Sequence, residues 1–151
     1  MAKLRIVKFG DSTLRKVARP VDEITPRICT LLDDMIETMR DAGGCGLAAP
    51  QVGVLRRIAV IEIEEGVVYE LINPKIIAFS GEQREQEGCL SNPGEYGITK
   101  RPKAVTVRAM NRKGEIYDLN GTDLLARAIC HECDHLDGKL YTDVQISEIK
   151  G

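Results

Sequence analysis

Apolar residues recur every three or four positions between Thr25 and Gly44, the spacing that places them on one face of an α-helix. Thr25 can cap the start of this helix, and Pro26 suits its first turn. Gly43 and Gly44 supply a stop signal. The pattern therefore predicts an amphipathic N-terminal helix that packs one face against a core.

Several later segments alternate apolar and polar residues or are rich in β-branched residues, as strands are. The turns between them contain glycine, in Glu64-Glu65-Gly66 and in "NRKG". The alternation is typical of half-buried antiparallel strands. The predicted strands span residues 57–63, 67–72, 104–110 and 115–120.

A second helical pattern, "NGTDLLARAICHECDHLDG", follows the strands and covers residues 120–138. We expect a turn at Asn120-Gly121 to open it and Gly138 to close it. The order helix, strands, helix indicates an α+β fold, with antiparallel sheets packed around the second helix and the N-terminal helix beside them. A length of 151 residues, without repeats or linker-like segments, predicts a single domain over residues 1–151.

Composition argues against several functional classes. A formal net charge of -2, with two Phe, four Tyr and no Trp, argues against nucleic-acid readout by charge or base stacking. No apolar run has the length of a signal-peptide core or a membrane span, so we expect a cytoplasmic protein without a membrane partner. Five cysteines, an odd number, fit a reducing compartment better than a disulfide framework.

The chain has two histidines, His131 and His135, which lie four residues apart in the second helix with Glu132 between them. One helical turn separates the two imidazoles, so they share a face and can bind one metal ion. Glu132 is close enough to that face to accept and donate protons there. The alternative is a pair of surface or core histidines, which the spacing and the intervening glutamate make the weaker interpretation.

The other positions divide the second helix into two sides. At about 100° per residue, Leu124, Arg127 and Ala128 fall near the histidine face and predict the wall of a cleft. Arg127 would lie at the mouth, where it either contacts substrate or pairs with a nearby carboxylate; both interpretations stay open. The opposite side, which predicts the core contact, holds Leu125, Ala126, Ile129, Cys133 and Leu136.

Two histidines do not complete a metal site, so a third ligand is needed. The longer pattern H-E-x-x-H-x-x-G-x-x-H has Tyr141 at its last position, and 16 residues follow His135, so we expect the third ligand upstream. Cys130 and Cys133 lie on the helix itself but point away from the histidines.

Three upstream cysteines are candidates for the third ligand. Cys29 falls among apolar residues of the first helix, and we interpret it as core filling. Cys45 and Cys89 remain open. Cys89 is the stronger candidate, because Gly88 allows close backbone approach and a polar "SNPG" turn follows soon after.

Three motifs resemble the signature motifs of the peptide deformylase family in order and spacing: "GCGLAAPQ" at residues 44–51, "EGCLS" at 87–91 and "HECDHLDG" at 131–138. The segments "INPKI" and "TPRI" add to a likeness that extends over nearly the whole chain. Taken alone, "GLAAPQ" would also fit a tightly packed turn.

The resemblance implies a role for each motif residue. It implies that Glu132 is the catalytic acid and base, and that the Gln51 amide and the Leu90 N–H stabilise an oxyanion. Gly46 would offer its backbone to a substrate that binds as an added strand. The implied metal ligands are Cys89, His131 and His135.

The implied reaction is hydrolysis of the formyl group on the N-terminal methionine of new polypeptides, with release of formate. Fe²⁺ is the implied working ion, and Zn²⁺, Co²⁺ or Ni²⁺ suit the same ligands. Formylmethionyl nascent peptides are the expected partner, with the ribosome near its exit tunnel as a second candidate. Cys130 before His131, and Arg127 in the cleft, depart from better-known members, and we expect them to alter the methionine pocket or the part of the cleft beyond it.

Two other classes share parts of this pattern. A general zinc peptidase would carry H-E-x-x-H, but it needs the downstream ligand that is missing after His135. A structural Cys₂His₂ zinc module would need a fourth protein ligand and would leave Glu132 without a role.

Overall fold

The computed structural model describes residues 3–150, so the outer limits of the domain expected over residues 1–151 lie outside the described range. Its α-helices are α1 (Pro26–Asp41) and α2 (Asp123–Leu136), and its short 3₁₀ helices are η1 (Ser12–Arg15), η2 (Ala49–Val52) and η3 (Tyr141–Asp143). The strands are β1 (Gly46–Ala48), β2 (Ile58–Ile61), β3 (Tyr69–Ser80), β4 (Gln83–Glu87), β5 (Glu95–Arg101), β6 (Ala104–Met110), β7 (Ile116–Thr122) and β8 (Gln145–Lys150).

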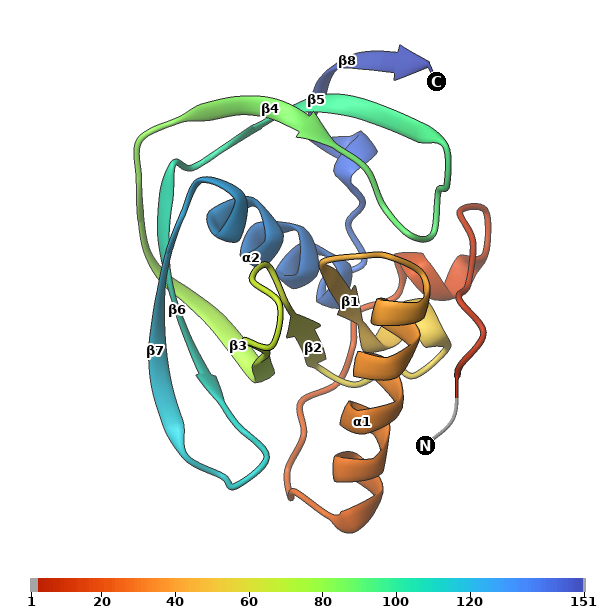
Figure 1. Cartoon of the computed structure of the whole chain (residues 1–151), viewed down its shortest axis with the longest axis vertical. Helices are drawn as coiled ribbons and strands as arrows, with labels where there is room; N and C mark the ends of the chain where they lie inside the picture. Colours follow the sequence, from red (N-terminus) through yellow and green to blue (C-terminus); the bar gives the residue numbers. More distant parts are fainter. Residues whose placement is uncertain (1–2, 151) are drawn as a thin grey trace.

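The strands form two antiparallel sheets. One has the order β1-β2-β3-β6-β7 and the other β4-β5-β8, so β1 and β4 are both edge strands. Helix α2 lies at the centre of the molecule, where it contacts β1, β2, β6 and β7 of the larger sheet and β5 of the smaller one (Figure 1). This is the α+β arrangement that the order of the sequence patterns predicts.

Helices cover both faces of the larger sheet where β1, β2 and β3 meet. Because side chains alternate along a strand, Leu47, Ile58, Val60 and Ile72 pack in one core cluster with the apolar face of α1. The intervening Ala48, Ala59, Ile61 and Leu71 pack in a second cluster with α2. Strand β2 is therefore buried on both faces, and the expectation of half-buried strands is wrong for it.

Helix α1 confirms the first predicted helix. The Thr25 side chain accepts a hydrogen bond from the Ile28 N–H at 3.3 Å, and Pro26 is the first helical residue. Leu32, Met35 and Met39 on its inner face are fully buried. The predicted spacing thus gives both the helix and its orientation on the sheet.

The turn predicted at Asn120-Gly121 is wrong, because β7 continues through both residues to Thr122 and leads directly into α2. Glycine is needed at 121 for another reason. A Cβ there would lie 2.9 Å from side-chain atoms of Leu125 and Ile129, so Gly121 allows the first turns of α2 to pack on the strand. At the other end, Gly138 follows the helix with a φ of +73°, as predicted.

Strands β1, β4, β5 and β8 were not predicted from the sequence. Strand β4, "QREQE", has no apolar residue, and its two buried side chains, Gln83 and Glu87, are polar. Strand β3 continues beyond the predicted end at residue 72. Proline has no N–H to donate to a neighbouring strand, but Pro74 lies where the pairing of β3 with β6 shifts register, and the strand tolerates it there. Hydrophobic alternation detects neither feature.

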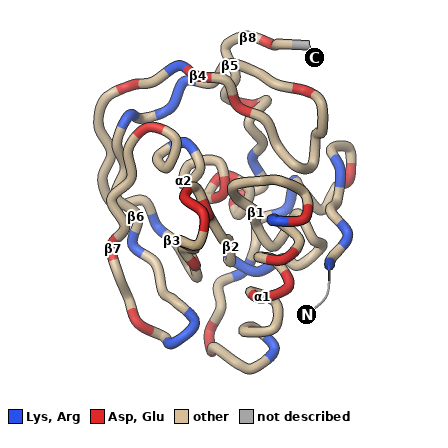
Figure 2. Tube along the Cα trace, viewed as in Figure 1, with Lys and Arg blue, Asp and Glu red and all other residues tan. Residues whose placement is uncertain are grey.

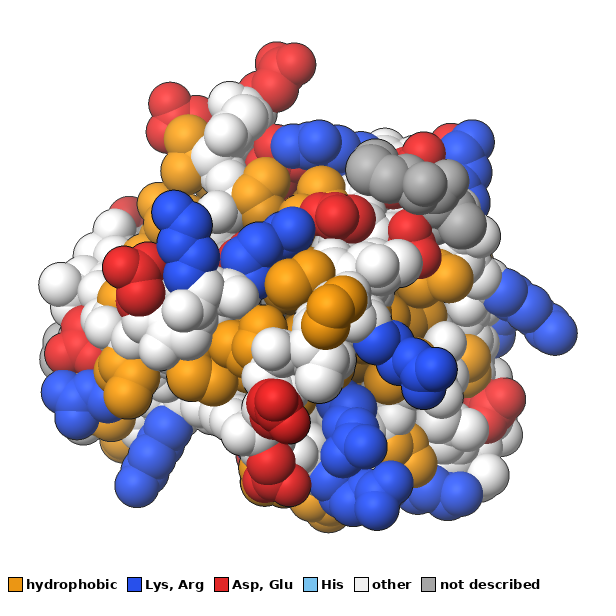
Figure 3. Space-filling model, turned by 90° about the horizontal axis from the view of Figure 1, so that it is seen from below, with side chains coloured by type: hydrophobic (Ala, Val, Ile, Leu, Met, Phe, Trp, Pro, Cys, Tyr) orange, Lys and Arg blue, Asp and Glu red, His pale blue; other side chains and the backbone are white. Residues whose placement is uncertain are grey.

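Basic and acidic residues are interspersed along the described chain (Figure 2). On the face seen in Figure 3, exposed hydrophobic side chains are likewise mixed with charged ones. No helix within residues 3–150 combines the length and apolar character needed to span a membrane.

Candidate functional site

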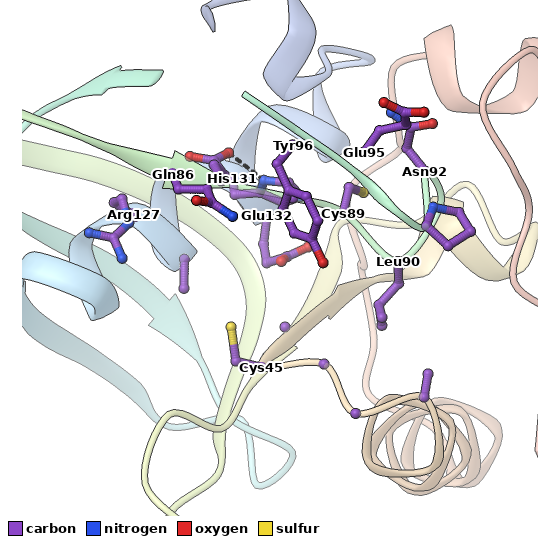
Figure 4. A pocket seen from close by; sticks show the side chains of 18 of the residues that line it. Cys45, Gln86, Cys89, Leu90, Asn92, Glu95, Tyr96, Arg127, His131 and Glu132 are labelled. Carbon is purple, nitrogen blue, oxygen red and sulfur yellow. Dashed lines mark hydrogen bonds and ion pairs between the residues drawn. The ribbon is translucent and has the colours of Figure 1, made fainter. Parts of the chain in front are cut away.

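An open cleft of about 470 Å³ runs along α2, a volume typical of small-ligand sites. Three segments form its walls (Figure 4). They are residues 42–46 at the start of β1, residues 86–96 from the end of β4 to the start of β5, and the outer face of α2. Each of the three sequence motifs therefore contributes to one cavity, although they lie far apart in the chain.

Cys89 and His131 line this cleft, and His135 lies buried next to them. Helix α2 carries both histidines, and the segment after β4 brings the cysteine to them. One potential ligand atom from each residue lies within 4.8 Å of the others, and Cys89 Sγ is 3.3 Å from His135 Nε2. The three side chains can thus surround one ion.

A carboxylate orients His131 from behind. Glu87 Oε2 lies 2.5 Å from His131 Nδ1, which leaves the Nε2 atom to face the cleft. Glu87 is held in turn by Arg101, whose Nη2 donates to it at 2.8 Å and whose Nη1 donates to Asp134 at 2.6 Å. Burial alone would raise the pKa of Glu87, but the hydrogen bonds from His131 and Arg101 outweigh it and lower that pKa to about 2.

The surroundings of the two histidines fit a cation. Burial favours neutral His131, yet Glu132, Cys89 and Glu87 together raise its pKa well above 6.5. Burial and the charge of His131 lower the pKa of His135 well below that value. The acids around His131 therefore favour positive charge at this place, and the imidazole and thiol groups of the three residues form a donor set suited to a divalent transition metal.

Glu132 is buried and points toward the backbone of β1. Its Oε1 atom has no hydrogen-bond partner among the described residues. A Cβ added to Gly46 would lie 2.4 Å from its Oε2 atom, so the glycine leaves space for the carboxylate. Burial raises the pKa of Glu132 to about 7, which is suitable for an acid and base at neutral pH.

Gln51 and Leu90 lie on the side of the cleft nearest the cysteine. The Gln51 Nε2 atom donates to Ser91 Oγ at 3.1 Å and, more weakly, to Cys89 Sγ at 3.4 Å. Its Oε1 atom accepts from the Ala48 N–H at 2.9 Å, which fixes the orientation of the amide. Both Gln51 and Leu90 line the cleft.

Leu124, Arg127 and Ala128 line the cleft, as the helical spacing predicts. Figure 4 shows Arg127 on the side away from Leu90. The Arg127 side chain is half-buried, and its Nη1 atom donates to Gln83 Oε1 at 2.8 Å. The partner of this arginine is thus an amide rather than a carboxylate.

The other four cysteines lie outside the three-residue cluster. Cys130 and Cys133 are buried in the core cluster between α2 and the larger sheet, and burial raises the pKa of Cys130 to about 11. Cys45 is exposed in the cleft wall, and Cys29 is half-buried on α1. The helix geometry predicted from sequence is confirmed for Cys130 and Cys133.

Sequence reasoning missed the residues that support the histidines. Glu87 was visible as the first letter of "EGCLS", but nothing in the pattern indicates its partners Arg101 and Asp134. Tyr141 was missed as well. Its ring stacks on the His131 ring with 6.1 Å between the ring centres, and its hydroxyl accepts a hydrogen bond from Asn92 at 3.0 Å. These contacts join segments that are distant in sequence, so they require the folded chain.

Comparison with known proteins agrees with this geometry. The family model described as polypeptide deformylase matches residues 3–150. A peptide deformylase of Alkaliphilus metalliredigens is 56% identical over 146 residues, covering 96% of this chain and 99% of that protein. One from Acetivibrio thermocellus is 57% identical over 143 residues, covering 95% of this chain and 84% of that protein.

Solved structures give the same result. A peptide deformylase from Legionella pneumophila has a TM-score of 0.92 at 42% identity, covering 94% of this chain and 85% of that one. The enzyme from Synechococcus elongatus, solved in complex with actinonin, has a TM-score of 0.92 at 40% identity, covering 94% of this chain and 80% of that one. Sequence and fold agree over nearly the full chain, and this protein therefore belongs to the peptide deformylase family.

Proposed function

We propose that the cleft along α2 hydrolyses the formyl group on the N-terminal methionine of new polypeptides and releases formate. Membership of the family supports the reaction. The observation that carries its assignment to this cleft is the cluster of Cys89, His131 and His135 next to the buried carboxyl of Glu132.

Cys89, His131 and His135 would hold one divalent metal ion, with a remaining position open to the cleft. When bound, the metal acts as a Lewis acid that activates water and polarises the formyl oxygen. The thiolate and imidazole donors suit Fe²⁺, Zn²⁺, Co²⁺ and Ni²⁺, and we propose Fe²⁺ as the ion used in the cell. Glu87 holds His131 in the orientation that binding needs.

Glu132 would move the protons of the reaction. Its pKa of about 7 lets it take a proton from the attacking water and return it to the departing amine. Gly46 leaves the carboxylate free to reach this position. The other acids that line the cleft are Glu87, which is bonded to Arg101 and His131, and Glu95, which is exposed.

Gln51 and Leu90 would stabilise the negative oxygen that forms on the formyl carbon. The Gln51 amide is already oriented by Ala48, and its weaker contact, to Cys89 Sγ, is the one that can be exchanged for a substrate oxygen. The Leu90 N–H follows directly after the cysteine. Loss of one such donor typically lowers the rate by about 10² to 10³.

The peptide would bind as an added strand between the two sheets. β1 and β4 are edge strands, and residues 44–46 and 86–88 face each other across the cleft. Such edges can pair with an extended peptide through backbone hydrogen bonds, with Gly46 among the contacts. Leu124 and Ala128 would offer apolar surface to the methionine side chain.

Formate release tests this proposal. Protein prepared without oxygen should release formate from a formyl-Met-Ala-Ser peptide amide but no acetate from the acetylated peptide, because the cleft is proposed to admit only the smaller acyl group. Actinonin, present in the Synechococcus elongatus complex, should block the reaction. Cleavage of internal peptide bonds would favour a general peptidase, and a firmly bound metal without any hydrolysis would favour a structural module.

We extend the proposal to the setting of the enzyme. Residues 1–151 would act as one catalytic domain in the cytoplasm, on nascent chains near the ribosomal exit tunnel. Co-sedimentation with ribosomes that carry nascent chains, compared with empty ribosomes, tests whether the nascent chain alone recruits the protein.

A further inference from the structure

Arg127 is a cation in the cleft wall that has no acidic partner among residues 3–150. Within that range the guanidinium makes one hydrogen bond, to the neutral amide oxygen of Gln83, although it has five N–H donors. Charged side chains that are partly buried are usually paired, since removing them from water is costly. The arginine therefore keeps both charge and donors for a ligand.

Two acids at this end of the cleft are engaged elsewhere. Asp123 pairs with Lys103 at 2.6 Å, and Glu87 is held by Arg101 and His131. Lys103, whose charge Asp123 offsets, interacts electrostatically with both Glu85 and Arg127. Among the described residues that line the cleft, Arg127 is the one lysine or arginine.

Gln83 sets the position of Arg127 without neutralising it. The Gln83 side chain is 6% exposed, and its Nε2 atom donates to the carbonyl oxygens of Pro102 and Asp123, both at 2.9 Å. Those bonds turn its Oε1 atom toward Arg127. The guanidinium is thus oriented in advance, which reduces the entropy lost when it binds a ligand.

We propose that Arg127 selects substrates, so that formylated peptides with an acidic third residue are preferred over those with a basic one. The inference rests on the proposed function and on a substrate bound as an extended strand. Side chains of such a strand alternate, so the first and third lie on the same face about 7 Å apart. A methionine against Leu124 and Ala128 then brings the third side chain toward Arg127, with the second pointing away.

Deformylation of two matched peptide series tests the inference. The peptides are formyl-Met-Ala-Xaa and formyl-Met-Xaa-Ala, with Xaa as Glu, Gln or Lys, and all carry C-terminal amides so that no terminal carboxylate supplies charge. In the first series we expect kcat/KM for Glu to exceed that for Lys by about fivefold at low salt, mainly through KM. Added salt should reduce the ratio.

Variants separate a local contact from the overall charge of the protein. Arg127→Gln should bring the Glu to Lys ratio close to one, and Arg127→Lys should keep part of it. Arg84→Gln is the matched control, because Arg84 adjoins Gln83 on β4 but is exposed and pairs with Glu82. It removes the same charge and should leave the ratio unchanged.

Three results would overturn the inference: a ratio near one in the unaltered protein, an equal effect of Arg84→Gln, or a preference at the second residue instead of the third. The neutral Gln peptides separate this inference from the proposed function. If they release no formate, the proposed function fails. If they release formate normally while the Glu to Lys ratio is near one, only the role of Arg127 fails.

Discussion

At the scale of single residues, Cys89 differs from the other cysteines in facing the two imidazoles. We predict that Cys89→Ser loses most of its bound metal, because a hydroxyl is a much poorer ligand than a thiolate for these ions. Cys130→Ser and Cys133→Ser should keep the metal, although each buries a hydroxyl at a cost of about 1–3 kcal/mol. Metal analysis of folded protein checks this, and stoichiometric metal in Cys89→Ser would refute the ligand assignment.

A substitution at Glu132 tests catalysis separately from metal binding. Glu132→Gln should keep the metal, because Glu132 is not a proposed ligand, and should lower kcat by about 10² to 10⁴ because an amide cannot transfer the proton. Metal content and formate release measured on the same preparation test both parts. Near-normal turnover would remove Glu132 from the mechanism.

Glu87 acts through its neighbour His131. Glu87→Gln removes the negative charge that orients the ring and leaves Arg101 with one acidic partner, so we expect metal affinity to fall about 10- to 100-fold. Competition with a chelator measures the affinity. Glu85→Gln, an exposed position on the same strand, is the control, and an equal loss in both variants would argue against the orienting role.

At the scale of elements, one tyrosine links strands that are not adjacent. The Tyr117 hydroxyl on β7 donates to the Glu70 carbonyl on β3, across the intervening β6. Burial raises the pKa of Tyr117 from 10.0 to about 12, so its unfolded form loses the proton first as pH rises. Its contribution to stability is complete below pH 10.0 and is lost as pH rises to about 12.

The free energy of unfolding should therefore fall more steeply between pH 10.0 and about 12 in the unaltered protein than in Tyr117→Phe. Urea unfolding at several pH values in this window measures the two slopes. Equal slopes would show that the tyrosine titrates alike in the folded and unfolded chain.

Sequence patterns located elements by their apolar spacing and therefore missed those that lack it. Helix α1 was predicted closely because Leu32, Met35 and Met39 repeat at helical spacing. Strand β4 was not, because its buried Gln83 and Glu87 are satisfied by hydrogen bonds from or to distant segments. A polar residue can be buried only when its partners are present, and those partners cannot be read from a local window.

At the scale of the molecule, two core clusters lie on opposite faces of the larger sheet, and of the two only one includes residues of α2, the helix that carries both histidines. Leu32 is fully buried in the α1 cluster. Leu32→Ala should lower the free energy of unfolding by about 2–5 kcal/mol through the cavity it leaves. Metal content at temperatures where the variant is folded should not change.

Urea unfolding measures the effect, with Val17→Ala as the control. Val17 is 65% exposed, and its replacement should change stability by no more than about 0.5 kcal/mol. A loss of metal from folded Leu32→Ala would show that the two clusters are coupled.

The sequence by itself determined which residues of the second helix share a face. The four-residue spacing places His131 and His135 on one face of α2, independently of how the rest of the chain folds. The same helical geometry points Cys130 and Cys133 away from that face. Local spacing also placed Leu124, Arg127 and Ala128 along the cleft, because a regular helix has one rigid geometry.

Only the tertiary structure shows how distant residues are arranged around the histidines. Residue chemistry favoured Cys89 over Cys45 and the family resemblance implied Cys89, and the fold brings Cys89 Sγ to 3.3 Å from His135 Nε2. It likewise decided that Glu87 holds His131 and that Arg127 meets Gln83 instead of a carboxylate. The physical reason is that these contacts join separate elements, whose relative positions follow from burying both faces of one sheet and not from any local repeat.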